Sequence, residues 1–139
     1  MTKSYTFFAD PGHGWLRVPV IELEEIKHKI TCFSYLKGKY TYLEEDLDAG
    51  TFLDYKFGNI SNYQELRDKG ILKQSVTDNQ SPIRGYESYH VRTPEEIKLM
   101  DKVINTLLQR NFNSNTKRTI RDASYESCKY WAKCYGIDV

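Results

Sequence analysis

The first ninety residues alternate short apolar or aromatic runs with turn-forming residues, a pattern typical of β-strands joined by tight turns. Strand-like runs occupy residues 4–8, 15–18, 31–36, 40–43, 71–77 and 83–91. The first two runs flank a turn rich in Pro and Gly, and the third and fourth flank Lys37-Gly38-Lys39, so each pair predicts a hairpin. Apolar residues at helical spacing follow in 20–30 and 49–57, the second after Asp46 or Asp48 as a helix cap. We therefore expect a small antiparallel sheet of about five to six strands with one or two packed helices.

The pattern changes to a helical period at Thr93. Thr93-Pro94-Glu95-Glu96 is a helix-capping signal, and one apolar stripe follows it at Ile97, Met100, Val103, Ile104, Leu107 and Leu108. A second helix is predicted from about residue 116 to 135, with Gly136 as its stop. The expected fold class is α+β, with a module at residues 1–91 and a C-terminal helical hairpin at residues 92–139 that packs on the module or projects from it.

Composition and length restrict the class of protein. A chain of 139 residues fits one core with an appendage, and 40% apolar residues with 28% charged residues is ordinary for a globular protein. No run approaches the roughly 20 apolar residues that span a bilayer, and no secretory signal is seen, so a cytoplasmic location without membrane contact is expected. Cys32, Cys128 and Cys134 lack CxxC spacing, which predicts reduced thiols and neither a disulfide framework nor a zinc site. No cofactor is expected.

Charge is distributed unevenly along the chain. Residues 1–91 contain 11 Lys or Arg against 13 Asp or Glu, and residues 92–139 contain 9 against 6. The basic half includes a stripe at four-residue spacing, with one further cation at its start: Lys117, Arg118, Arg121, Tyr125, Lys129 and Lys133. Such a stripe fits an acidic protein surface or nucleic-acid phosphates, while Asp122 and Glu126 favour an ordinary solvated face. Because the overall excess of cations is small, protein contact is the favoured functional interpretation and nucleic acid the lesser one.

Two groups of residues are candidates for catalysis or metal binding. His13 lies between two glycines near Asp10, where it could act as a general base. In the structural interpretation of this loop, Gly12 and Gly14 adopt unusual backbone dihedrals and His13 bonds a neighbouring carbonyl. The acids Glu44, Glu45 and Asp46 could bind a hard cation, or could cap a helix and face solvent. No nucleophile or phosphate-binding glycine motif accompanies either group.

Several segments together resemble a known family. The signature of a family of small tailed-phage and prophage proteins is similar to four segments of this chain: Asp10-Pro11-Gly12-His13-Gly14-Trp15, Ser34-Tyr35 with Gly38, Tyr42-Leu43-Glu44-Glu45-Asp46, and Ser81 with Ile83-Arg84 and Tyr86. The match covers roughly residues 5–89. It implies a bacteriophage or prophage origin, hence the cytoplasm of a bacterial host cell, and no established activity. The helical part from Thr93 onward departs from the family's shorter layout.

Three functional hypotheses follow. The first is a non-enzymatic phage accessory protein that binds and inhibits a host factor, foremost an antiviral defence component such as a CRISPR effector (anti-CRISPR-like). The second is a metal-dependent nuclease or phosphohydrolase that uses His13, Asp10 and the nearby acids. The third is a sequestering binder of a small signalling nucleotide, in which aromatic residues and Arg84 line a pocket. Homodimer formation is left open by the exposed tyrosines and amphipathic helices.

Overall fold

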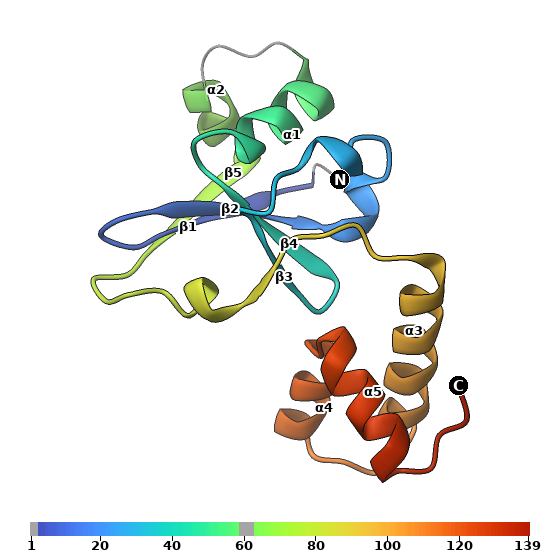
Figure 1. The fold of residues 1–139 in the computed structure, drawn as a ribbon. Coiled ribbons are helices and arrows are strands. Elements are labelled where there is room, and N and C mark those ends of the chain that lie inside the picture. The colour runs from blue at the N-terminus through green and yellow to red at the C-terminus, as the bar shows by residue number, and fades with distance from the viewer. Residues whose placement is uncertain (1–2, 59–62) are drawn as a thin grey trace. The chain divides into compact units, whose positions relative to one another are not determined.

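The computed structural model describes residues 3–58 and 63–139 and has the expected α+β class, with a six-stranded sheet followed by helices (Figure 1). The backbone forms two compact units: Met1–Leu36 with Tyr40–His90, and Lys37–Lys39 with Val91–Val139. Each unit is described separately below. No helix among the described residues is long and apolar enough to cross a membrane.

The sheet of the first unit has the strand order β5-β1-β2-β4-β3-β6. Its strands are β1 (Tyr5–Ala9), β2 (Gly14–Pro19), β3 (Tyr35–Lys37), β4 (Tyr40–Glu44), β5 (Leu72–Val76) and β6 (Glu87–Ser88). The first hairpin is confirmed, because β1 and β2 pair antiparallel with Phe7 opposite Leu16. The expectation of a wholly antiparallel sheet is wrong at β5, which pairs parallel with β1. The chain between β4 and β5 contains two helices, and a crossover of this length returns β5 to the sheet edge in the direction of β1.

Two helices cover one face of the sheet: α1 (Asp48–Phe57) and α2 (Tyr63–Asp68) (Figure 1). Phe52 of α1 is fully buried, and its ring meets the Tyr5 ring edge-on at a centroid distance of 5.3 Å. The helix expected at residues 20–30 is instead two 3-10 turns, η1 (Val20–Leu23) and η2 (Lys27–Lys29), and a third turn, η3 (Pro82–Gly85), precedes β6. Leu23 and Ile26 are both buried, so the apolar spacing that resembles a helix reflects the burial of these side chains and not a continuous helix.

The second unit is built from α3 (Pro94–Leu108), α4 (Ser114–Arg121) and α5 (Tyr125–Cys134). The predicted capping box is confirmed, with Thr93 and Glu96 each bonding the other's backbone N–H. The single helix expected from about residue 116 to 135 is wrong: the Ser124 hydroxyl accepts the Ser127 N–H and begins a new helix after a break. The apolar stripe of α3 packs with residues of α4 and α5 in one core, formed by Met100, Val103, Ile104, Leu107, Ile120, Ala123, Cys128 and Ala132.

Candidate functional site

The Asp10 carboxylate connects two segments that lie far apart in the sequence. Its Oδ1 accepts the backbone N–H groups of Gly12 at 3.0 Å and His13 at 2.9 Å, and its Oδ2 accepts the Ser81 N–H at 2.9 Å. The Arg84 guanidinium adds two bonds, Nε to Oδ2 at 2.7 Å and Nη2 to Oδ1 at 2.8 Å. Because the Asp10 side chain is fully buried, these five donors fix the loop after β1 against η3.

The charge state of Asp10 follows from these contacts. The Arg84 hydrogen bonds hold the pKa of Asp10 well below its usual range, against the opposing effect of burial, and the backbone N–H groups lower it further. The same pair raises the pKa of Arg84 above its usual value. The carboxylate bonds the backbone of His13, while the imidazole lies 6.0 Å from the Trp15 ring. Asp10 therefore orients the loop, and its oxygens are occupied by donors other than the His13 ring.

The glycines of this loop are required for close approach, which corrects the expectation of unusual dihedrals. The positive-φ glycines among the described residues are Gly38, Gly58, Gly70 and Gly136. A Cβ on Gly12 would lie 2.9 Å from Nη2 of Arg84, and a Cβ on Gly14 would lie 2.4 Å from the Phe7 ring. The loop thus needs glycine where Arg84 and Phe7 pack against its backbone.

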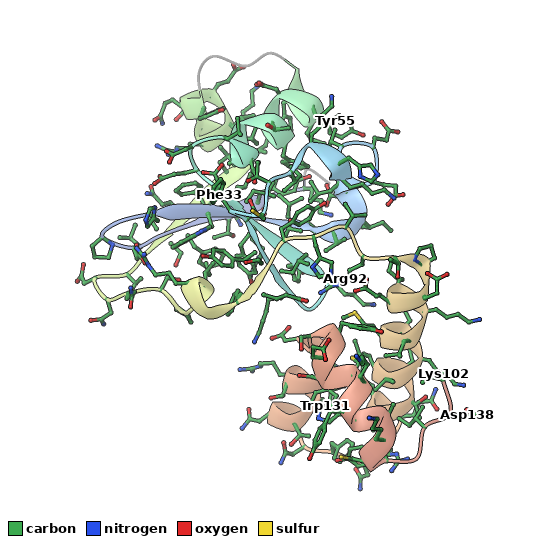
Figure 2. The ribbon with its side chains drawn as sticks, viewed as in Figure 1. Phe33, Tyr55, Arg92, Lys102, Trp131 and Asp138 are labelled. Atoms are coloured by element: carbon green, nitrogen blue, oxygen red, sulfur yellow. The ribbon has the colours of Figure 1, made fainter. Side chains whose placement is uncertain are left out.

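This loop forms one wall of an open groove of about 480 Å³, which we call the aromatic groove. It is lined by His13, Gly14, Trp15, Phe33, Tyr35, Glu44, Glu45, Asp46, Leu47 and Arg84. Trp15 is buried, and the Arg84 guanidinium lies 5.6 Å from the centre of its ring. Phe33, just before β3, is 73% exposed (Figure 2), and Leu47 is 57% exposed. Segments that carry the resemblance to phage proteins therefore meet at one surface.

The acidic residues of the groove have different roles. The Glu44 carboxylate accepts the backbone N–H groups of Asp46 at 2.8 Å and of Leu47 and Asp48 at 2.7 Å each. Glu44 thus caps the N-terminus of α1. The prediction that Asp46 or Asp48 provides this cap is wrong. Glu45 and Asp46 are exposed. Among the residues that the structure describes, no three His, Cys, Asp or Glu side chains gather as a set that could hold a metal ion.

A buried polar network supports the groove from below. Asp48 and Ser34 are both fully buried, and the Ser34 hydroxyl donates to Asp48 Oδ2 at 2.5 Å and accepts the Glu44 N–H at 3.0 Å. The same Oδ2 accepts the backbone N–H of Thr31 at 3.0 Å and its hydroxyl at 2.7 Å. The network ties the loop that carries Phe33 to β4 and to the start of α1. Sequence reasoning assigned no role to Ser34 or Thr31, because nothing in their spacing marks a shared acceptor.

The six residues of the predicted basic stripe lie on two helices. Lys117, Arg118 and Arg121 belong to α4, and Tyr125, Lys129 and Lys133 belong to α5. The break after Arg121 interrupts the four-residue spacing, so the stripe is not one continuous helical face. Tyr125 is half-buried against the helical core, as is Trp131 (Figure 2). Lys129 Nζ lies 3.6 Å from Glu126 Oε2 and 5.2 Å from the Tyr125 ring centre.

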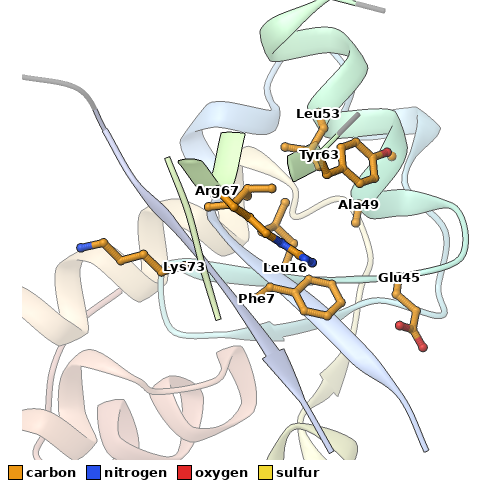
Figure 3. Close-up of a pocket in the computed structure, with 10 residues that line it drawn as sticks. Phe7, Leu16, Glu45, Ala49, Leu53, Tyr63, Arg67 and Lys73 are labelled. Atoms are coloured by element: carbon orange, nitrogen blue, oxygen red, sulfur yellow. The ribbon is translucent and has the colours of Figure 1, made fainter. Parts of the chain in front are cut away.

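A second cavity, of about 210 Å³, lies between the sheet and the two helices that cover it, and we call it the α1–α2 cavity (Figure 3). It is lined by Phe7, Leu16, Glu45, Ala49, Gly50, Leu53, Tyr63, Arg67, Leu72 and Lys73. Glu45 lines both cavities. Sequence reasoning missed this cavity because its walls come from three strands and two helices.

Protein-family models, curated protein sequences and solved structures were compared with the chain, and none matches it. The resemblance of residues 5–89 to phage proteins therefore stays a prediction. The two cavities and the exposed apolar side chains beside them are the features from which a function can be argued.

Proposed function

We propose that the protein is a non-enzymatic phage or prophage accessory protein that binds a host protein through the aromatic groove. The observation that carries the proposal is the exposure of Phe33 and Leu47, at 73% and 57%, on a groove that contains Trp15 and Tyr35. Large apolar side chains exposed beside a concave aromatic surface are typical of protein interaction sites. The buried bonds of Asp10 fix one wall in advance, which lowers the entropy lost on binding.

The charge of the groove favours a protein segment over a nucleotide or a nucleic acid. Its lining contains three carboxylates, of Glu44, Glu45 and Asp46, and one guanidinium, of Arg84. Both hydrogen-bonded nitrogens of Arg84 already face the Asp10 carboxylate, so its charge is largely neutralised for a ligand. Phosphate groups would meet the exposed acids. An apolar anchor flanked by Lys or Arg fits this surface, because the cations would face Glu45 and Asp46.

The proposed target is a host factor whose inhibition benefits the phage, and an antiviral defence effector of the CRISPR type is the foremost candidate. This step rests on the resemblance of residues 5–89 to phage proteins. It is supported by the position of the shared segments, because Trp15, Tyr35, Glu44 and Arg84 all line the groove. The cations of α4 and α5, all exposed except the half-buried Lys117, form a second candidate contact on the helical unit.

Quantitative affinity purification from a bacterial host tests the proposal with four tagged forms of the full chain. These are the wild type, Phe33→Ser with Leu47→Ser, the charge reversal Lys117→Glu with Arg121→Glu and Lys129→Glu, and the control Ile21→Ser. Ile21 is 82% exposed and is not part of the groove lining, so it matches the polarity change of the groove variant. We expect one host protein to be enriched by the wild type and the control and lost from the groove variant.

Two other outcomes separate the competing interpretations. If only the charge-reversal variant fails to enrich the host protein, the contact lies on the helical unit and not on the aromatic groove. Equal enrichment by all four forms would refute both surfaces. The enzymatic alternative has its own support, since His13, Glu45 and Asp46 line the same groove. Metal-dependent cleavage of nucleic acid or nucleotides that His13→Ala abolishes would replace the binding proposal.

A further inference from the structure

We propose that the α1–α2 cavity is a binding site for a small organic anion, with one carboxylate or phosphate monoester on a single-ring apolar body. The interior supplies apolar contact from both layers, with Leu16 and Leu72 from the sheet and Leu53 from α1, all three buried. Phe7 and Tyr63 add aromatic rings to the walls (Figure 3). Such a concave apolar site with a few polar groups at its edge is typical of small-molecule pockets.

One cation gives the site its preference for an anion. Arg67 of α2 lines the cavity, and its side chain forms no ion pair or hydrogen bond with another residue that the structure describes. Lys73 of β5 also belongs to the lining, but neighbouring strand residues point to opposite faces, and in Figure 3 its amine extends away from the Arg67 guanidinium. Figure 3 shows the Arg67 side chain extending over the cavity toward Phe7. Lys69, a cation just beyond the same helix, is instead paired with Glu65 at 3.0 Å. A guanidinium beside apolar walls binds an oxyanion in bidentate geometry.

Size and the remaining charge restrict the ligand further. A volume of about 210 Å³ is below the common range for drug-sized ligands, and it accommodates a single ring better than a nucleotide. Glu45 occupies another part of the lining and would repel a second anionic group. In Figure 3 its carboxylate is turned away from the Arg67 guanidinium. The cavity therefore favours one oxyanion at Arg67, with the ring between Phe7 and the leucines.

Amide chemical-shift titrations of the full chain test the site with four probes. Benzoate and phenyl phosphate carry the ring and an oxyanion, benzamide carries the ring without charge, and inorganic phosphate carries the charge without the ring. We expect benzoate, phenyl phosphate or both to bind with a Kd on the order of 1 mM and to shift the Gly50 and Arg67 signals. Benzamide and inorganic phosphate should bind at least about tenfold more weakly, because each lacks one half of the interaction.

Three variants connect binding to the cavity. Arg67→Gln should weaken binding of the anionic probes about tenfold, and the control Lys69→Gln should leave it unchanged, because Lys69 is not in the lining. Gly50→Met should abolish binding, since a Cβ at Gly50 would already lie 3.4 Å from the Tyr63 hydroxyl and a longer side chain would occupy the cavity mouth. Gly50 is inside α1, where methionine is a better helix former, so the melting temperature should not fall.

The outcomes decide the proposal independently of the host-protein experiment. Binding of only one anionic probe would support the site and identify the preferred oxyanion. The proposal is overturned if neither anionic probe shifts Gly50 or Arg67 at about 20 mM, some twentyfold above the expected Kd. It is also overturned if benzamide binds as tightly as benzoate, or if Arg67→Gln binds as tightly as the wild type.

Discussion

Replacing Ser34 by Ala removes a buried hydroxyl that makes two hydrogen bonds beneath the aromatic groove. The hydroxyl donates to the Asp48 carboxylate at 2.5 Å and accepts the Glu44 N–H at 3.0 Å, and Ser34 is fully buried. A hydrogen bond to a charged group contributes about 1.5–3 kcal/mol and a neutral one about 1 kcal/mol. Water cannot easily replace either partner in an enclosed site. We therefore expect Ser34→Ala to lower the free energy of unfolding by about 2–4 kcal/mol.

The size of this loss in stability depends on whether another donor can replace the Ser34 hydroxyl at the Asp48 carboxylate. Asp48 Oδ1 is buried without a hydrogen-bond partner in the described structure, and Oδ2 then keeps only the two donors of Thr31. For a chain of this length, 1 kcal/mol corresponds to about 3–4 °C in melting temperature. The expected fall in melting temperature is thus about 6–16 °C. An exposed serine of the same unit, Ser88, provides the matched control, and Ser88→Ala should change stability by less than about 0.5 kcal/mol.

Urea denaturation followed by tryptophan fluorescence measures the loss. Trp15 is buried in the first unit and Trp131 belongs to α5, so a Trp131→Phe background leaves Trp15 as the reporter of the sheet. The m-value should be unchanged, since Ser34→Ala alters stability and not the surface exposed on unfolding. A loss below about 1 kcal/mol would refute the reasoning, because it would mean that the buried hydroxyl contributes less than one neutral hydrogen bond.

Two further predictions concern titration and thiol reactivity. Because contacts with Arg84 lower the pKa of Asp10, its contribution to stability should be complete above about pH 5 and should be lost as the pH falls below the ordinary value near 3.9. Thermal melts should thus show Asp10→Asn well below the wild type at pH 7, with a gap that narrows below about pH 4; a constant gap would contradict the assignment. Burial raises the pKa of Cys128 to about 11, whereas Cys32 and Cys134 are exposed. Maleimide labelling at pH 8 should therefore modify Cys32 and Cys134 in the native protein and Cys128 only after unfolding, as read by intact mass; rapid native labelling of Cys128 would refute its burial.

The elements with strong local signals were predictable from the sequence. The β1–β2 hairpin follows from two apolar runs around a Pro- and Gly-rich turn, and α3 follows from its capping box and one apolar stripe. These signals lie within a few residues of one another, so no distant contact is needed to interpret them. The α+β class followed from the change of period at Thr93.

Errors in the predicted fold arose where distant contacts compete with local pattern. Alternation of apolar and polar residues predicts that a segment is a strand, but it does not predict which strand pairs with it. The parallel pairing of β5 with β1 was therefore missed. Residues 20–30 have apolar spacing like that of a helix, but they form two 3-10 turns. Two short turns are enough to bury Leu23 and Ile26, so the same spacing does not require a helix. The break between α4 and α5 depends on the Ser124 cap, which competes with a helical pattern that extends across it.

The candidate sites were determined by the tertiary structure. Asp10 and Arg84 are 74 residues apart, and their pairing converts a potential catalytic acid into a support for the loop before Trp15. Glu44 lies within an acidic run, but only its place at the end of β4 aims its carboxylate at the first turn of α1. The sequence by itself determined the elements with strong local signals, such as the β1–β2 hairpin and α3, since those choices depend on local chemistry. The sheet order and the helices packed on it decided which side chains share a cavity, because those contacts join residues that no local pattern relates.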